Sequence, residues 1–138
     1  MKIIDANVIL RYLTNDVPDQ AKRVEKLLEK VEAGDEDVFL PDIILADIIW
    51  ILEGYYKQPR ERIRDWITTL LSLRGLKFSD KNIALDALDI YVDKGIDWSD
   101  AFTASQMINR GIAEIYSFDK HFDRIANITR VEPLGDQA

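Results

Sequence analysis

The sequence predicts an α/β fold with a short, mainly parallel sheet. Short apolar runs typical of buried strands alternate with longer segments whose apolar residues recur at helical spacing. Pro and Gly stand where those helices would begin and end. The chain of 138 residues fits one packed core. We therefore expect a single domain over residues 1–134, followed by a frayed tail at residues 135–138.

Five short apolar runs are the expected strands. The first ends at Asp5, and the second is closed by Pro41. In full, the expected strands are residues 2–5, 38–40, 76–78, 112–118 and 128–131. Their alternation with helices indicates that most of them pair in parallel.

Helices are expected between these strands. Pro18 suits a first turn and Gly34 suits a helix end. The expected helices run over residues 7–13, from Pro18 to Gly34, over residues 43–55, from Pro59 to Gly75, from a cap at Ser79 or Asp80 to Gly95, and over residues 98–110, with a helical turn at residues 119–125. The helix at residues 43–55 is apolar nearly all round, so we expect it to be buried and capped by Asp42.

The composition narrows the classes of function. Eighteen basic and 25 acidic residues give a formal charge of −7, which argues against indiscriminate nucleic-acid binding. The chain has no cysteine, so disulfides and cysteine-ligated metals are excluded. Its N-terminus reaches a charge too early for a signal peptide, and no apolar run approaches the roughly 20 residues that span a bilayer. We expect a cytoplasmic protein without a membrane partner.

Four aspartates border or interrupt apolar segments: Asp5, Asp47, Asp100 and Asp119. Asp5 and Asp119 each follow an expected strand, where parallel sheets place their ligands. Asp100 lies at the start of an expected helix. If the four converge, Mg²⁺ or Mn²⁺ would compensate their charge, because both ions take oxygen ligands. For all but Asp47, helix capping is the alternative explanation.

Asp47 is harder to explain as a cap. It lies in the middle of an expected helix, where Asp is a poor helix former, and Ile43 and Trp50 lie one turn away. A narrow solvent-facing stripe shared with Glu53 is the alternative.

Further polar residues lie beside the four acids. Asn7 and Ser117 offer neutral groups that can orient a carboxylate, a water molecule or a phosphate. Asp97 begins the same helix as Asp100. His121 follows Asp119 by two positions. We leave His121 outside the core set, because a single surface histidine is more often incidental than catalytic.

Together these residues resemble the PIN-domain family and, within it, the VapC-type toxins. The resemblance rests on four strings in order: Asp5-Ala6-Asn7 after a strand, the acid-bearing helix at residues 40–53, Asp97-Trp98-Ser99-Asp100, and Ser117-Phe118-Asp119. It implies a three-layer α/β/α sandwich with a short, mainly parallel central sheet.

The resemblance also implies an activity. It is that of a Mg²⁺- or Mn²⁺-dependent endoribonuclease, the toxin of a type II toxin–antitoxin system, in which metal-activated water hydrolyses RNA. It implies that Asp5, Asp100 and Asp119 bind metal, with Asn7, Asp97 and Ser117 in support. Asp47 stands where the family usually has Glu, so a water bridge is an alternative to direct coordination. A homodimer and an antitoxin with a basic side chain are the implied partners.

The basic residues are bunched along the chain. Arg11, Arg60, Arg62 and Arg64 are candidate phosphate contacts, and a solvated helix face is the alternative.

Two rival functions remain open at this stage. A domain that keeps the fold without cleavage is favoured only by Asp47 in place of Glu. A Mg²⁺-dependent phosphoryl-transfer domain also places an Asp after its first strand, but Asn7 and Lys120 do not fit its patterns.

Overall fold

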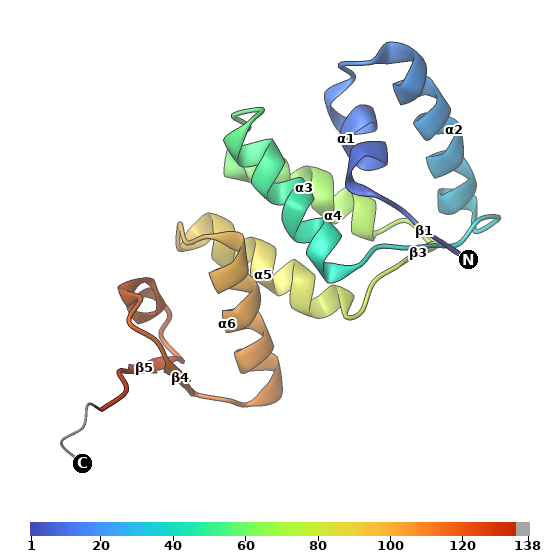
Figure 1. The fold of residues 1–138 in the computed structure, drawn as a ribbon. Coiled ribbons are helices and arrows are strands. Elements are labelled where there is room, and N and C mark those ends of the chain that lie inside the picture. The colour runs from blue at the N-terminus through green and yellow to red at the C-terminus, as the bar shows by residue number, and fades with distance from the viewer. Residues whose placement is uncertain (135–138) are drawn as a thin grey trace. The chain divides into compact units, whose positions relative to one another are not determined.

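The computed structural model describes residues 1–134, and the tail expected at residues 135–138 lies outside them. Six α-helices, one 3-10 turn and five short strands make up this part of the chain (Figure 1), which confirms the predicted α/β class. The chain divides into an N-terminal unit, Met1–Lys81, and a C-terminal unit that begins at Asn82. Within residues 1–134, no helix is both long and apolar enough to cross a membrane.

A three-stranded parallel sheet organises the N-terminal unit. Its strands are β1 (Lys2–Ile3), β2 (Val38–Phe39) and β3 (Leu76–Lys77), paired in that order. The helices are α1 (Ala6–Thr14), α2 (Pro18–Ala33), α3 (Asp42–Gly54) and α4 (Arg60–Leu71). Helix α1 packs against α2 and α3, and α3 packs against α4. Because every strand connection contains helices, the parallel pairing follows from the alternation seen in the sequence.

Buried aliphatic side chains hold these helices together. The fully buried ones include Ile9 of α1, Val31 of α2, Ile48 of α3 and Ile67 of α4. Each is roughly 2 kcal/mol more favourable inside the core than in water. Residues at helical spacing therefore build this core as the sequence predicted.

Glycines have two different roles in this unit. Gly34 ends α2 as predicted, with a φ of 81° in the left-handed region. The prediction that Gly75 stops α4 is wrong, because that helix already ends at Leu71. A Cβ at Gly75 would lie 2.1 Å from the backbone oxygen of Glu36. Gly75 therefore permits a close backbone approach, at which its N–H also donates to the Val31 carbonyl.

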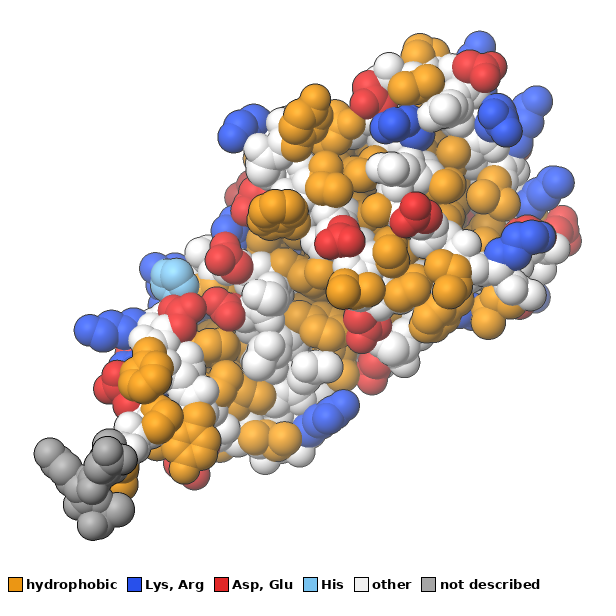
Figure 2. Space-filling view, in the orientation of Figure 1, with side chains coloured by type: hydrophobic (Ala, Val, Ile, Leu, Met, Phe, Trp, Pro, Cys, Tyr) orange, Lys and Arg blue, Asp and Glu red, His pale blue; other side chains and the backbone are white. Residues whose placement is uncertain are grey.

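Helix α3 departs from its prediction in two ways. Pro41 occupies its N-cap, and the Asp42 carboxylate makes no capping bond but accepts from the Ser79 hydroxyl over 2.6 Å. One side of the helix is buried, but Ile43 is 72% and Trp50 77% exposed. Figure 2 shows hydrophobic side chains predominating over α3, with acidic ones among them. The expectation of burial all round is therefore wrong for this face.

The C-terminal unit supplies the remaining elements. These are α5 (Lys81–Asp93), α6 (Trp98–Arg110), β4 (Glu114–Tyr116), the 3-10 turn η1 (Lys120–Arg124) and β5 (Thr129–Val131). Strands β4 and β5 pair in parallel, with Glu114 opposite Thr129. Helix α6 begins and ends as predicted, and Gly111 follows it with a φ of 70°. The buried Ser105 hydroxyl of α6 donates to the Ile83 carbonyl of α5 over 2.7 Å.

Candidate metal centre

Three side chains of the C-terminal unit come together at one place. Asp100, Asp119 and His121 each offer one ligand atom, and these atoms lie within 4.8 Å of one another. Asp100 lies in the first turn of α6, Asp119 follows β4, and His121 lies in η1. The sequence predicted the two acids but left His121 outside the set. The signal available for His121 was its spacing, because a tight turn brings residues two apart close together.

The start of α6 is fixed by aromatic packing. The Trp98 ring lies edge-on to Tyr91 of α5, with ring centres 6.2 Å apart, and the ring centre of Phe102 lies 5.6 Å from that of Trp98. Asp97 occupies the N-cap with extended backbone and makes no side-chain capping bond. Asp100 is therefore carried on a helix end that is anchored by the buried rings of Trp98 and Tyr91.

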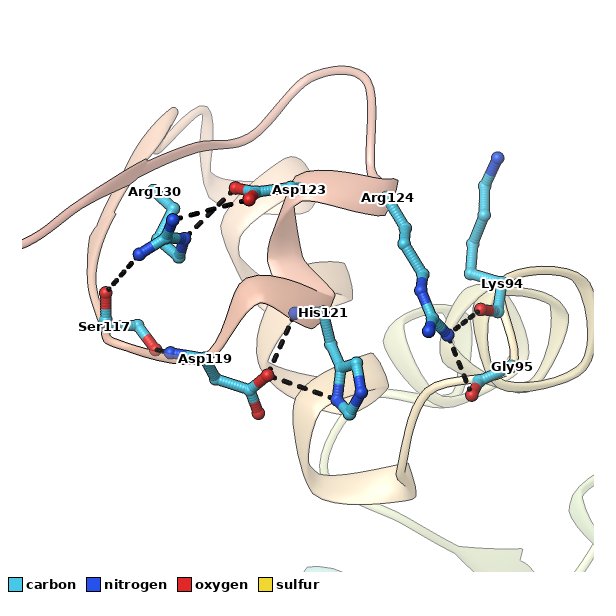
Figure 3. Close-up of polar contacts among 8 residues, drawn as sticks. All are labelled: Lys94, Gly95, Ser117, Asp119, His121, Asp123, Arg124 and Arg130. Atoms are coloured by element: carbon cyan, nitrogen blue, oxygen red, sulfur yellow. Dashed lines mark hydrogen bonds and ion pairs between the residues drawn. The ribbon is translucent and has the colours of Figure 1, made fainter.

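Asp119 is held by its own turn. Its Oδ1 accepts the backbone N–H of His121 at 2.9 Å and lies 3.1 Å from the His121 Nδ1. The Asp119 N–H donates to the Ser117 hydroxyl at 2.9 Å. Figure 3 shows the backbone nitrogen and a ring nitrogen of His121 meeting one carboxylate oxygen, while the other oxygen points away from them. Asp119 thus caps η1 with one oxygen and leaves the second for another partner.

The η1 turn is anchored beyond Asp119 as well. The Arg124 guanidinium donates to the carbonyls of Lys94 and Gly95, at 3.0 and 3.3 Å. Arg130 of β5 lies 3.1 Å from Asp123 and donates to the Ser117 carbonyl at 3.3 Å (Figure 3). The sequence reasoning missed both arginines, because nothing in their spacing marks them.

The two carboxyls have unlike acidities. Burial raises the pKa of Asp100, and the charge of Asp119 and a hydrogen bond with it raise that pKa further. The backbone N–H of His121 lowers the pKa of Asp119, and the His121 side chain and Asp100 lower it too. The two carboxylates repel each other when both are charged, and a bound cation would relieve that repulsion. Two carboxylate oxygens with an imidazole nitrogen form a donor set for a divalent metal.

The other two predicted acids belong to the N-terminal unit. Asp5 lies just after β1 and caps α1, with its Oδ1 accepting the Ala6 N–H at 2.8 Å. Asn7 is exposed in the first turn of α1. Asp47 is exposed on α3 between Ile43 and Trp50. The inference that α3 leaves Asp47 little room for a solvent face is therefore wrong, although Glu53, expected to share its exposed stripe, is half-buried.

The candidate phosphate contacts differ in their surroundings. Arg11 donates to Gln20 at 2.9 Å, and with Asn7 and Arg23 it lines a shallow cavity of about 530 Å³ between α1 and α2. On α4, Arg60 lies 3.0 Å from Glu53, and the Arg62 guanidinium lies 6.0 Å from the Trp66 ring centre. Helical geometry places Arg60 and Arg64 on one side of α4 and Arg62 on nearly the opposite side.

Comparison with known proteins matches the chain over nearly its whole length. A model of the PIN domain family matches residues 2–128. A VapC ribonuclease of Aquifex aeolicus (strain VF5) is 24% identical over 125 residues, which cover 91% of this chain and 92% of that protein.

Proposed function

Because the chain belongs to the PIN domain family, we propose that it is a metal-dependent endoribonuclease and the toxin of a type II toxin–antitoxin pair. The observation that carries the proposal is the cluster of Asp100, Asp119 and His121, which has the donor set of a divalent metal site. The VapC ribonuclease that resembles the chain supports RNA as the substrate. Family membership also argues against the rival hypothesis of a phosphoryl-transfer domain, which has another fold.

The proposed metal ligands are Asp5, Asp47, Asp100 and Asp119, and the proposed ion is Mg²⁺ or Mn²⁺. The family match spans residues 2–128 and so includes acids from both units, which supports one domain with one function. A bound cation would lower the pKa of a water molecule and stabilise charge on the phosphodiester. Asp47 acts directly or through a water molecule.

The supporting residues act by holding the acids in place. The Ser117 hydroxyl accepts the Asp119 N–H and so shapes the turn that presents the carboxylate. Asp97 is the N-cap residue of α6, and its backbone carbonyl accepts the Ala101 N–H in the turn that carries Asp100. Asn7 follows Asp5 on the first turn of α1, where its amide can bind a phosphate oxygen or a water molecule.

Basic residues of the N-terminal unit are the proposed RNA contacts. Arg11 and Arg23 line the same shallow cavity as Asn7, so a backbone phosphate there would be close to a predicted site residue. Arg60, Arg62 and Arg64 remain candidates. Replacing Arg60, Arg62 and Arg64 with Gln, singly and together, tests them, because each true phosphate contact lowers the salt dependence of binding by about one unit. Unchanged binding and cleavage would remove them.

The N-terminal unit also offers a surface for an antitoxin. A groove of about 850 Å³ lies along α1, α2 and α4, with Leu28, Leu70 and Trp66 among its lining. Glu25, Glu29 and Glu32 line it as well, at the spacing of one helix side. An apolar segment with basic residues would fit it, since complementary charge favours such a partner. The exposed Ile43 and Trp50 of α3 support the proposed homodimer.

Cleavage of a total-RNA pool tests the proposal. The purified protein is compared in Mg²⁺, in Mn²⁺ and in EDTA with an Asp5→Asn/Asp100→Asn double variant. We expect cutting that requires metal and is lost in the variant, and the fragment ends would identify the RNA. No cutting by folded, inhibitor-free protein in either metal would instead favour a catalytically degenerate PIN domain.

A further inference from the structure

The His121 ring lies where it can take part in the metal centre itself. One of its ring nitrogens lies within 4.8 Å of a carboxylate oxygen of Asp100 and one of Asp119. Its Nδ1 is 3.1 Å from the Asp119 Oδ1. Two adjacent ligands at right angles, each about 2.1 Å from an ion, are separated by about 3 Å. The spacing of these two atoms is therefore that of neighbouring ligands on one metal.

The turn holds the ring in this position. The backbone N–H of His121 bonds to Asp119, so the first turn of η1 cannot rotate away without losing that bond. At the end of η1, Arg124 donates to the carbonyls of Lys94 and Gly95, which follow α5 (Figure 3). The His121 side chain is 46% exposed, so an ion can reach the ring from solvent.

We propose that His121 is a nitrogen ligand of the metal, so that the C-terminal unit supplies two carboxylates and one imidazole. This inference rests on the proposed metal-dependent function and deepens it. Imidazole suits first-row transition metals, whereas Mg²⁺ prefers oxygen ligands and retains its waters. The consequence is a site that discriminates in favour of Mn²⁺ over Mg²⁺ more than a site made only of carboxylates.

The rival role for the same ring is a hydrogen bond. If Nδ1 carries a proton, it donates to Asp119 and orients that carboxylate without touching the ion. Such a positioning role would change the affinities for both metals alike, because it acts through an oxygen ligand that both ions share. The two roles therefore differ in a spectroscopic signature and in metal selectivity.

The experiment measures binding of Mn²⁺ alone to the full chain, without RNA. Pulsed electron paramagnetic resonance detects a nitrogen bonded to Mn²⁺, and incorporation of ¹⁵N-histidine identifies it as the single His121. Titrations with Mn²⁺ and with Mg²⁺ then compare the wild type with His121→Asn and with Lys120→Gln, a control on the same exposed turn. Circular dichroism establishes that each variant is folded.

We expect a histidine nitrogen signal in the wild type and none in His121→Asn. The Mn²⁺ dissociation constant should rise by about tenfold or more in that variant, while the Mg²⁺ constant changes by less than about threefold. Mn²⁺ binding without a nitrogen signal, or equal losses for both metals, would overturn the inference and leave the nuclease proposal standing. No Mn²⁺ binding by the wild type would overturn both.

Discussion

Tyr56 donates its hydroxyl to the Oδ2 of Asp16 over 2.7 Å, and this bond joins two connections of the N-terminal unit that are 40 positions apart. Asp16 lies between α1 and α2, and Tyr56 lies between α3 and α4. The bond from Tyr56 lowers the pKa of Asp16, with help from Thr14 and Arg11. The bond to Asp16 likewise raises the pKa of Tyr56.

These shifts predict a pH window of stability. The lowered pKa of Asp16 contributes stability above its unfolded value of about 3.9, which is lost as pH falls through the folded value. The raised pKa of Tyr56 contributes stability below about 10, which is lost as pH rises through its folded value. We therefore expect Tyr56→Phe to lower the melting temperature most between these limits and least near pH 2.5. Tyr55→Phe, at an exposed neighbouring ring, is the control.

A second prediction concerns how the candidate metal centre affects the stability of the fold when no metal is bound. The raised pKa of Asp100 means that its charged form is disfavoured in the fold, so its contribution to stability is present at low pH and declines as pH rises. We expect Asp100→Asn to melt at a higher temperature than the wild type at pH 7 in EDTA. With Mn²⁺ the order should reverse, because only the wild type gains from binding. A lower melting temperature in EDTA would contradict this account.

The third prediction uses a matched pair of glycines. Gly75→Ala should cost about 3 kcal/mol, because its Cβ would meet the Glu36 backbone oxygen and the connection between α2 and β2 would have to shift. Gly54→Ala should instead stabilise by roughly 0.5–1 kcal/mol, since nothing lies within 4 Å of its Cβ and it lies in α3. Urea unfolding of both variants gives the two free energies. Equal effects of the two substitutions would contradict the close approach at Gly75.

Gly75 also shows what the sequence could predict and what it could not. Periodicity and stop signals predicted α2 and α6 closely, because Pro18, Gly34 and Gly111 act through local backbone geometry. Gly75 acts through its close approach to the Glu36 backbone, in the connection between α2 and β2, and no local pattern encodes that contact. The exposed face of α3 was missed for a similar reason, since the apolar Ile43 and Trp50 read as core in any local window.

The candidate metal centre was likewise predicted only in part from the sequence. Asp100 and Asp119 were predicted to serve one site because each lies at the end or start of an element, and the structure brings both to one cluster. His121 could not be separated from an incidental surface histidine, because its proposed role depends on the direction of a ring that only the fold of η1 sets. The participation of Asp5 and Asp47 stays a prediction.

The last prediction tests Asp47. Because its side chain is exposed, Asp47→Asn should change the free energy of unfolding by less than about 0.5 kcal/mol. If Asp47 holds the metal directly or through water, cleavage should nonetheless fall by about 10- to 100-fold. Asp89→Asn, on an exposed position of α5, is the control for loss of one negative charge. RNA cleavage at saturating Mn²⁺ with both variants measures the effect, and unchanged cleavage by Asp47→Asn would remove Asp47 from the site.

Asp47→Glu then tests whether the shorter side chain limits the site. A large gain in cleavage would indicate that the shorter side chain weakens the site, and no change would indicate that Asp47 serves as it stands.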